Sequence, residues 1–316
     1  MKEIVLEYID KYFPTLSKRK IGKILFHDHP DIFKDAEGAR KKVRYYLGEN
    51  GEKSRSHKPN EYLLPVEENE DYSPFVIPEA CDKILVMADV HAPYHDNGAI
   101  MVATKYGKRV GVNTILLNGD IFDFYSFSRF RKDPRLVNPK VDITSGIEFL
   151  TWLRGEFTEC EIYFRYANHD DRIEKYAIAN APLLWQADLI RLDDVLGLTK
   201  LGITTIRDNH IVHAGKLRLI HGHEIHGSGD LAFPARTVYN ACHKSMFVDH
   251  SHRTSLHTEP DVDKKVVTCW SGGCLCTLFP AWKPINKWNH GFAVVSTEGD
   301  LFDVENMRII DGRACH

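Results

Sequence analysis

Five short apolar runs in the middle of the chain each end in side chains that can bind a metal ion. The runs are ILVMAD, NTILLNGD, EIYFRYANHD, LRLIHGH and MFVDHSH. They alternate with helical stretches, which is the pattern of an α/β domain whose strands are buried. We therefore expect an α/β fold in which the five strand ends converge on one edge.

The residues at these strand ends form a chemically consistent set. In chain order they are Asp89 and His91; Asn118, Asp120 and Asp123; Asn168, His169 and Asp170; His221 and His223; His250 and His252. In D-x-H and H-x-H, residues two apart point to the same face if the strand geometry persists, so each pair could reach one ion cluster. Of His221 and His223, we prefer His221 because it directly follows the apolar run. Carboxylate, amide and imidazole ligands together suit manganese, iron or zinc better than calcium.

The order D-x-H, GD-x-x-D, N-H-D, H and H-x-H resembles the calcineurin-like metallophosphoesterase superfamily over residues 83 to 254. The resemblance implies a four-layer αββα sandwich, with two mixed sheets flanked by helices.

The resemblance also implies two divalent metal ions, with Mn²⁺ expected and Fe²⁺/Fe³⁺ or Zn²⁺ as alternatives. The implied ligands are Asp89, His91 and His252 for the first ion, Asn168, His221 and His250 for the second, and Asp120 as the bridge. His169 would assist the leaving group while a hydroxide between the ions attacks phosphorus. Asp170 or Asp123 could orient the surrounding groups. The chain departs from the family's pattern at Ala167 and Asp249, where glycine is usual.

The sequence around GDIFD bears on the substrate. Protein phosphatases of this superfamily carry arginine after GD-x-x-D, whereas this chain has Phe124. GDIFD resembles instead the DNA repair exonuclease branch, to which the Mre11 and SbcD nucleases belong. Candidate phosphate contacts are Arg129, Arg131, Arg172 and Arg253. We expect a phosphodiesterase or nuclease acting on nucleic acid. The alternatives are a phosphomonoesterase or cyclic-nucleotide phosphodiesterase, and a DNA-binding protein with an inert metal site.

The chain divides into segments of different composition. Residues 1 to 60 predict a basic helical domain with helices over Lys2 to Tyr12, after Ser17, and from Asp35 to Leu47. Between Thr15 and Lys58, twelve Lys and Arg oppose six Asp and Glu, and a helix-turn-helix-like unit of this kind could bind DNA. Residues 61 to 80, rich in Pro and Glu, predict a linker. Residues 81 to 316 then form the metallophosphoesterase domain, in which VVTCWSGGC, GFAVVST and LFDVENMRII should complete a second sheet.

Overall composition narrows the remaining possibilities. The 41 basic and 44 acidic residues leave the chain near neutral, so any attraction to a polyanion must be local. The charged N-terminus and the lack of an apolar run of ~18 residues predict a cytoplasmic protein without a membrane span. Seven irregularly spaced cysteines predict no disulfide framework. We expect Cys274 and Cys276 to be buried small residues rather than metal ligands.

Overall fold

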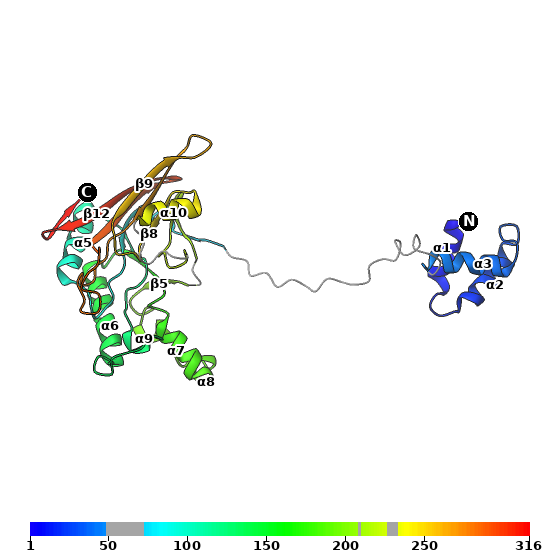
Figure 1. Cartoon of the computed structure of the whole chain (residues 1–316), viewed down its shortest axis with the longest axis horizontal. Helices are drawn as coiled ribbons and strands as arrows, with labels where there is room; N and C mark the ends of the chain where they lie inside the picture. The colour runs from blue at the N-terminus through cyan, green and yellow to red at the C-terminus, as the bar shows by residue number, and fades with distance from the viewer. Residues whose placement is uncertain (49–72, 208–209, 226–232) are drawn as a thin grey trace. The chain divides into compact units, whose positions relative to one another are not determined.

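The computed structural model describes residues 1–48, 73–207, 210–225 and 233–316. The chain forms two compact units, Met1–Glu70 and Asp71–His316 (Figure 1). Residues 49–60 of the expected helical domain and residues 61–72 of the expected linker lie outside the described part. The end of the expected linker belongs to the second unit, because β1 (Phe75–Val76) pairs in parallel with β6 (Val212–Ala214).

The first unit contains the three helices that the sequence predicts. They are α1 (Lys2–Tyr12), α2 (Lys18–Asp28) and α3 (Ala36–Tyr46). Ser17 and Asp35 cap α2 and α3, since each side chain accepts a hydrogen bond from the backbone N–H three residues on. The fully buried residues Val5, Ile21, Leu25, Ala39 and Val43 form its core.

The strands of the second unit form two mixed sheets. The described residues of the first, seven-stranded sheet run in the order β13 (Arg313–Cys315), β12 (Leu301–Ile310), β11 (Gly291–Glu298), β2 (Lys83–Met87), β3 (Thr114–Leu117), β4 (Glu161–Arg165) and β5 (Ile203–Ile206). The described residues of the second, six-stranded sheet run in the order β1, β6, β7 (Leu217–Leu219), β8 (Met246–Val248), β10 (Val266–Ser271) and β9 (Ser255–Pro260). Strands β2 to β5 are parallel, and antiparallel pairs extend both sheets.

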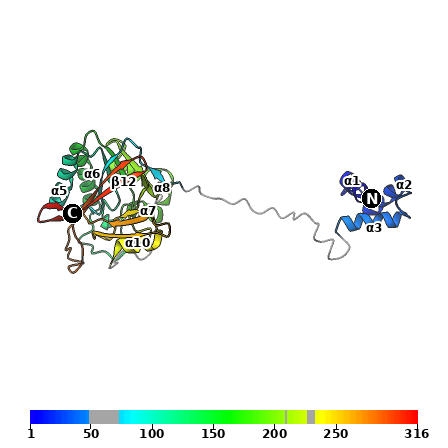
Figure 2. The same ribbon diagram turned by 90° about the horizontal axis from the view of Figure 1, so that it is seen from above.

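Helices cover the outer face of each sheet. The second unit contains α5 (Asn97–Val110), η1 (Tyr125–Phe127), α6 (Pro139–Glu156), α7 (Arg172–Asn180), α8 (Pro182–Gln186), α9 (Leu192–Leu196) and α10 (Pro234–Cys242). Side chains of α5, α6 and α9 pack on the seven-stranded sheet, and α10 packs on the six-stranded sheet (Figures 1 and 2). A third cluster of buried side chains joins the two sheets. The αββα sandwich is therefore confirmed.

Strand β2 shows why these runs are apolar throughout. Leu85 and Met87 face the helices, while Ile84 and Val86 face the other sheet. Because side chains alternate along a strand, a strand between two apolar layers is buried on both sides. No helix in the described ranges is long and apolar enough to cross a membrane.

The C-terminal strands occupy a different sheet from the one expected. β10 joins the six-stranded sheet, but β11 and β12 extend the seven-stranded sheet, with Ala293 opposite Val86. The expectation that all three complete the second sheet is therefore wrong. The physical reason is that β11 is apolar on both faces: Val294 packs toward the helices and Val295 toward the other sheet. Such a strand suits the middle of the sandwich.

Gly146 of α6 allows this helix to pack closely on the loop after β3. A methyl group at this position would overlap the ring of Phe122. Gly155 lies in the same helix with nothing within 4 Å of the corresponding point. Both glycines therefore have a helical backbone, but only Gly146 packs against another side chain.

We expect Gly146→Ala to lower the free energy of unfolding by about 1–3 kcal/mol, because the added methyl group overpacks the core. The matched change Gly155→Ala should raise stability by about 0.5–1 kcal/mol through helix propensity alone. Urea unfolding followed by circular dichroism measures both. Equal effects at the two positions would contradict the close packing of α6 on Phe122.

Candidate metal centre

The sequence-predicted site residues lie just beyond the ends of strands from both sheets. Asp89 and His91 follow β2, Asp120 follows β3 and Asn168 follows β4, all in the seven-stranded sheet. His221 follows β7, and His250 and His252 follow β8, in the six-stranded sheet. The edge that the sequence indicated is therefore divided between two facing sheets.

The backbone at this edge is not extended. Asp89, His91, Asp120, His250 and His252 all have positive φ angles, between 50° and 66°. The alternating strand geometry used to explain the D-x-H and H-x-H pairs is therefore wrong, because each pair lies past the end of its strand. A left-handed conformation costs a non-glycine residue roughly 1–2 kcal/mol, and such strain clusters at functional sites.

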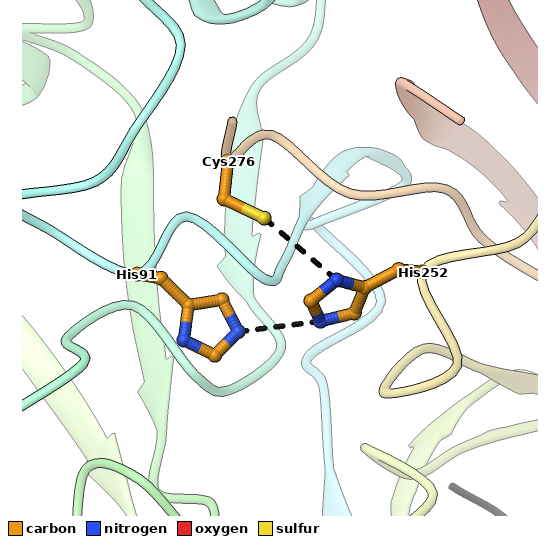
Figure 3. A group of neighbouring side chains, drawn as sticks. All are labelled: His91, His252 and Cys276. Atoms are coloured by element: carbon orange, nitrogen blue, oxygen red, sulfur yellow. Dashed lines mark hydrogen bonds between the residues drawn. The ribbon is translucent and has the colours of Figure 1, made fainter. Parts of the chain in front are cut away.

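Asp89, His91 and His252 bring their ligand atoms to one point. His252 Nε2 lies 3.1 Å from Asp89 Oδ1. His91 Nε2 lies 3.3 Å from His252 Nε2 and 3.7 Å from Asp89 Oδ1. Figure 3 shows the two imidazole rings facing each other. This group matches the set expected at a first metal ion.

A second group lies next to the first. His221 Nε2 is 3.2 Å from Asp120 Oδ2, and His250 Nδ1 is 3.2 Å from His221 Nε2. Asp120 Oδ2 is also 3.9 Å from His91 Nε2. The Asp120 carboxylate therefore lies between the two groups, where a bridging ligand would lie. His252 and His250 belong to different groups although only Ser251 separates them.

Two buried oxygens indicate that these residues fit cations. Both oxygens are buried: Asp89 Oδ1 faces the imidazole nitrogens of His252 and His91, and Asn168 Oδ1 has no hydrogen-bond partner among the described residues. A buried polar atom left in this state costs about 1–3 kcal/mol. Burial opposes the charge of Asp89, but His252, His91 and His221 outweigh it and hold the pKa of the Asp89 carboxyl well below its usual range. Anionic oxygens beside converging imidazole nitrogens suit a pair of divalent ions.

Partners behind the imidazoles set which nitrogen faces the centre. His221 Nδ1 donates to the backbone oxygen of Asn118 at 2.9 Å, which leaves Nε2 as the nitrogen that faces Asp120, 3.2 Å from its Oδ2. The other histidine of H-G-H, His223, instead has Nδ1 3.5 Å from Glu224 Oε2. In the described residues, the clusters able to hold a metal include His221 and His250 and leave out His223.

Cys276 is a site neighbour that sequence reasoning missed. Its Sγ lies 3.7 Å from His252 Nδ1, on the opposite side of the ring from the Nε2 that faces Asp89 (Figure 3). Contact with Cys274 and burial raise the pKa of the Cys276 thiol, and Cys276 also forms, with His91 and His252, a cluster able to hold a metal ion. Both cysteines are buried, as expected. The C-x-C spacing gave no signal of the contact, which depends on a long loop returning to β8.

Asp170 holds the loop that carries Asp120. Its carboxylate is fully buried and accepts four backbone hydrogen bonds, from Asp120, Ile121, Phe122 and Ala167, at 2.7 to 3.1 Å. Burial and the charge of Asp120 raise the pKa of Asp170, and the backbone N–H groups oppose that rise. Asp170 is thus a positioning residue for the backbone.

The two departures from the family's glycine pattern are accommodated locally. Ala167 fits because Gly119, with φ of 100°, has no Cβ; one placed there would lie 2.5 Å from the Ala167 Cβ. Asp249 is buried, and its Oδ2 accepts a hydrogen bond of 2.7 Å from Asn118 Nδ2. Burial and the charge of Asp89 raise the pKa of Asp249 to about 8.

His169 lies at the mouth of the centre between Asp123 and Arg172. Its Nδ1 is 3.0 Å from Asp123 Oδ1, and its Nε2 is 2.9 Å from Arg172 Nη2. Because a guanidinium only donates, Nε2 accepts and Nδ1 carries the proton. Burial lowers the pKa of His169, and His91 and Arg172 add to this against the charges of Asp120 and Asp123. The ring is therefore neutral here.

The other arginines with a predicted role lie on surrounding loops. Arg129 and Arg131 are exposed after η1, and the Arg129 guanidinium lies 5.2 Å from the Phe130 ring centre. Arg253 is half-buried and follows His252 directly. Arg172 Nη1 also donates to the backbone oxygen of Asp123 at 2.7 Å.

Comparison with known proteins places the second unit in a family. No curated protein sequence matches the chain. Among solved structures, vacuolar protein sorting 29 from Cryptosporidium parvum has a TM-score of 0.42 and 13% identity over 74% of this chain and 94% of its own. The phosphoesterase Yfce from E. coli has a TM-score of 0.37 and 13% identity over 68% and 88%. The family model of calcineurin-like phosphoesterases matches residues 82–273. The chain therefore belongs to the calcineurin-like phosphoesterase family and is a metal-dependent phosphoesterase.

Proposed function

We propose that this chain hydrolyses phosphodiester bonds of nucleic acid with two divalent metal ions, Mn²⁺ by preference. The observation that carries the proposal is Phe124, which stands where the protein phosphatase branch has its phosphate-gripping arginine. Phe124 is fully buried, has φ of 46°, and stacks on Phe122 with ring centres 5.0 Å apart. No cation can reach substrate from this position. A phosphodiester carries less negative charge than a monoester dianion, so it tolerates that loss better.

The proposed ligands keep the roles that the family resemblance implies. Asp89, His91 and His252 hold one ion; Asn168, His221 and His250 hold the other; Asp120 joins them. When bound, two such ions activate a water molecule near neutral pH and neutralise phosphoryl charge. The convergence of these side chains on one buried point supports the proposal, since a preorganised site avoids reorganisation during the reaction.

His169 is proposed to protonate the leaving oxygen. Asp123 accepts a hydrogen bond from the Nδ1–H of His169, which orients the ring and stabilises its charged form, and Nε2 is then the atom that delivers a proton. In the structure Arg172 Nη2 lies 2.9 Å from His169 Nε2. A proton on Nε2 requires Arg172 to donate to another acceptor instead, and in the proposed reaction the phosphoryl oxygens supply it.

The same Arg172 is the observation that favours a second function, phosphomonoester hydrolysis. Its guanidinium lies beside His169 and could replace the cation that Phe124 does not supply. A small cyclic-nucleotide substrate would also fit this alternative. Substrate preference separates these functions from the proposed one.

With Mn²⁺ bound, we expect kcat/KM on bis(p-nitrophenyl) phosphate and single-stranded DNA to exceed that on p-nitrophenyl phosphate by at least about tenfold, or about 1.4 kcal/mol. Asp120→Asn should lower every activity by more than about 100-fold. Loss of a residue that only hydrogen-bonds to a metal ligand already lowers activity by about 10- to 100-fold, and Asp120 is proposed as a ligand itself. The exposed Asp263→Asn is the control. Hydrolysis of monoesters alone would overturn the diester assignment, and wild-type activity in Asp120→Asn would point to an inert metal site.

His169→Ala should discriminate between leaving groups. Loss of a general acid costs about 10²–10⁴-fold when the leaving oxygen is a poor one, as in a nucleotide. The p-nitrophenolate ion leaves without a proton, so its release should slow far less. Comparing kcat for an oligonucleotide and for bis(p-nitrophenyl) phosphate measures this, with His27→Ala, an exposed histidine of the first unit, as control. Equal losses on both substrates would exclude proton donation by His169.

We also propose that the first unit binds DNA through exposed basic side chains of α2 and α3. Arg19, Lys20, Lys41 and Lys42 are exposed. Changing these four to Gln should weaken DNA binding and lower the slope of log affinity against log salt by roughly 1 for each phosphate that the variant no longer neutralises. Hydrolysis of bis(p-nitrophenyl) phosphate should not change. Lys264→Gln with Lys265→Gln is the control, and unaltered DNA affinity in the fourfold variant would refute the proposal.

A further inference from the structure

We infer that residues 277–289, here named the tryptophan loop, form a stacking site for an unpaired nucleobase beside the metal centre. The inference rests on the proposed function, since it names the part of a nucleic-acid substrate that lies next to the phosphate undergoing hydrolysis. It does not depend on the basic helices of the first unit.

The tryptophan loop carries an aromatic surface from a metal-site histidine outward to solvent. The Trp288 ring lies 4.3 Å from the His252 ring, centre to centre, and covers it at an angle of 51°. Trp282 lies 5.7 Å from Trp288, and 74% of its surface is exposed. A base stacked on this surface would lie within one nucleotide of a phosphate held at the centre.

The loop is braced rather than loose. Asn286 Nδ2 donates to the backbone oxygens of Leu278 and Lys283, and Asn286 Oδ1 accepts from the Trp288 N–H at 2.9 Å. The Asn289 N–H donates to the backbone oxygen of His252 at 3.0 Å. The backbone that carries Trp288 is thus fixed by hydrogen bonds within the loop and to His252, which lowers the entropy cost of binding.

Charge and exposure favour a nucleic acid as the occupant. The loop contains two lysines and no acidic residue, and Lys283 Nζ lies 5.4 Å from the Trp288 ring centre. Phe279 and Ile285 are also exposed, at 64% and 92%. Proteins bind single-stranded nucleic acid with exposed aromatic rings and nearby cations. The rings stack on the bases, and the cations attract the phosphates that link the nucleotides. A paired base is already stacked, so the occupant is an unpaired one.

A protein partner is the other kind of occupant for such a surface. A protein would explain the exposed apolar side chains equally well, but it gives no reason for the surface to begin on the ring of His252. The position beside the metal centre is what favours the nucleobase, and a comparison of base-bearing with abasic substrates separates the two.

Trp282→Ala should lower kcat/KM on a single-stranded tetranucleotide by about 5- to 100-fold, mainly through KM, which is the range expected for loss of one stacked base. It should leave hydrolysis of methyl p-nitrophenyl phosphate, and of the same tetranucleotide made abasic, unchanged. Trp282→Phe should retain most activity on the base-bearing substrate. Leu301→Ala, which removes an equally exposed apolar side chain from β12, is the matched control.

Loss of the same size on base-bearing and abasic substrates, or no loss on either, would overturn the stacking site.

Binding tests the inference separately from catalysis. Quenching of tryptophan fluorescence by the tetranucleotide should give a higher affinity than for its abasic form, and Trp282→Ala should abolish the difference. If the wild-type protein cleaves no diester, the proposed function fails. Base-dependent binding that is lost in Trp282→Ala would still support the stacking site, and base-independent binding would reject it.

Discussion

The site depends on two buried carboxylates, Asp89 and Asp120, held within 4 Å of several imidazole nitrogens. Carboxylate oxygens and imidazole lone pairs are both acceptors, so in a buried space they cannot hydrogen-bond to each other. A proton or a cation between them is needed to stabilise the arrangement. Asn168 Oδ1 is buried beside them and has no hydrogen-bond partner among the described residues. The fold tolerates these groups because a pair of divalent ions would satisfy them together.

The surrounding structure supports this arrangement. Five of the proposed ligands adopt a left-handed backbone conformation, and the cost of that conformation is borne by the packed sheets beneath. Asp170 fixes the Asp120 loop through four backbone N–H groups, and Asn118 connects the first sheet to Asp249 after β8 in the second. The ligands are therefore positioned by buried polar contacts that span the two sheets.

Substrate choice depends on side chains around the metals rather than on the ligands themselves. Burying Phe124 removes the cation used by protein phosphatases, while Arg172 brings another one to His169 from the start of α7. The tryptophan loop adds an exposed aromatic surface against His252. Under the proposed function, these features would let the site hold phosphate with modest charge and recognise an attached base by stacking.

The sequence by itself determined the fold class, the three N-terminal helices and the set of strand-end residues, because apolar runs, N-cap residues and ligand types are local properties of the chain. It could not assign β11 and β12 to their sheet, since a strand that is apolar on both faces, as β11 is, fits either sheet. Pairing of β11 with β2 places β11, and β12 is placed in turn by its pairing with β11. It also misjudged the backbone at the D-x-H and H-x-H pairs, where the strands end before the ligands and the conformation turns left-handed. The contacts of Cys276 and of Trp288 with His252 were decided only by tertiary structure. Each joins a side chain to a residue on a separate element or loop turn, and no periodicity along the chain encodes such a meeting.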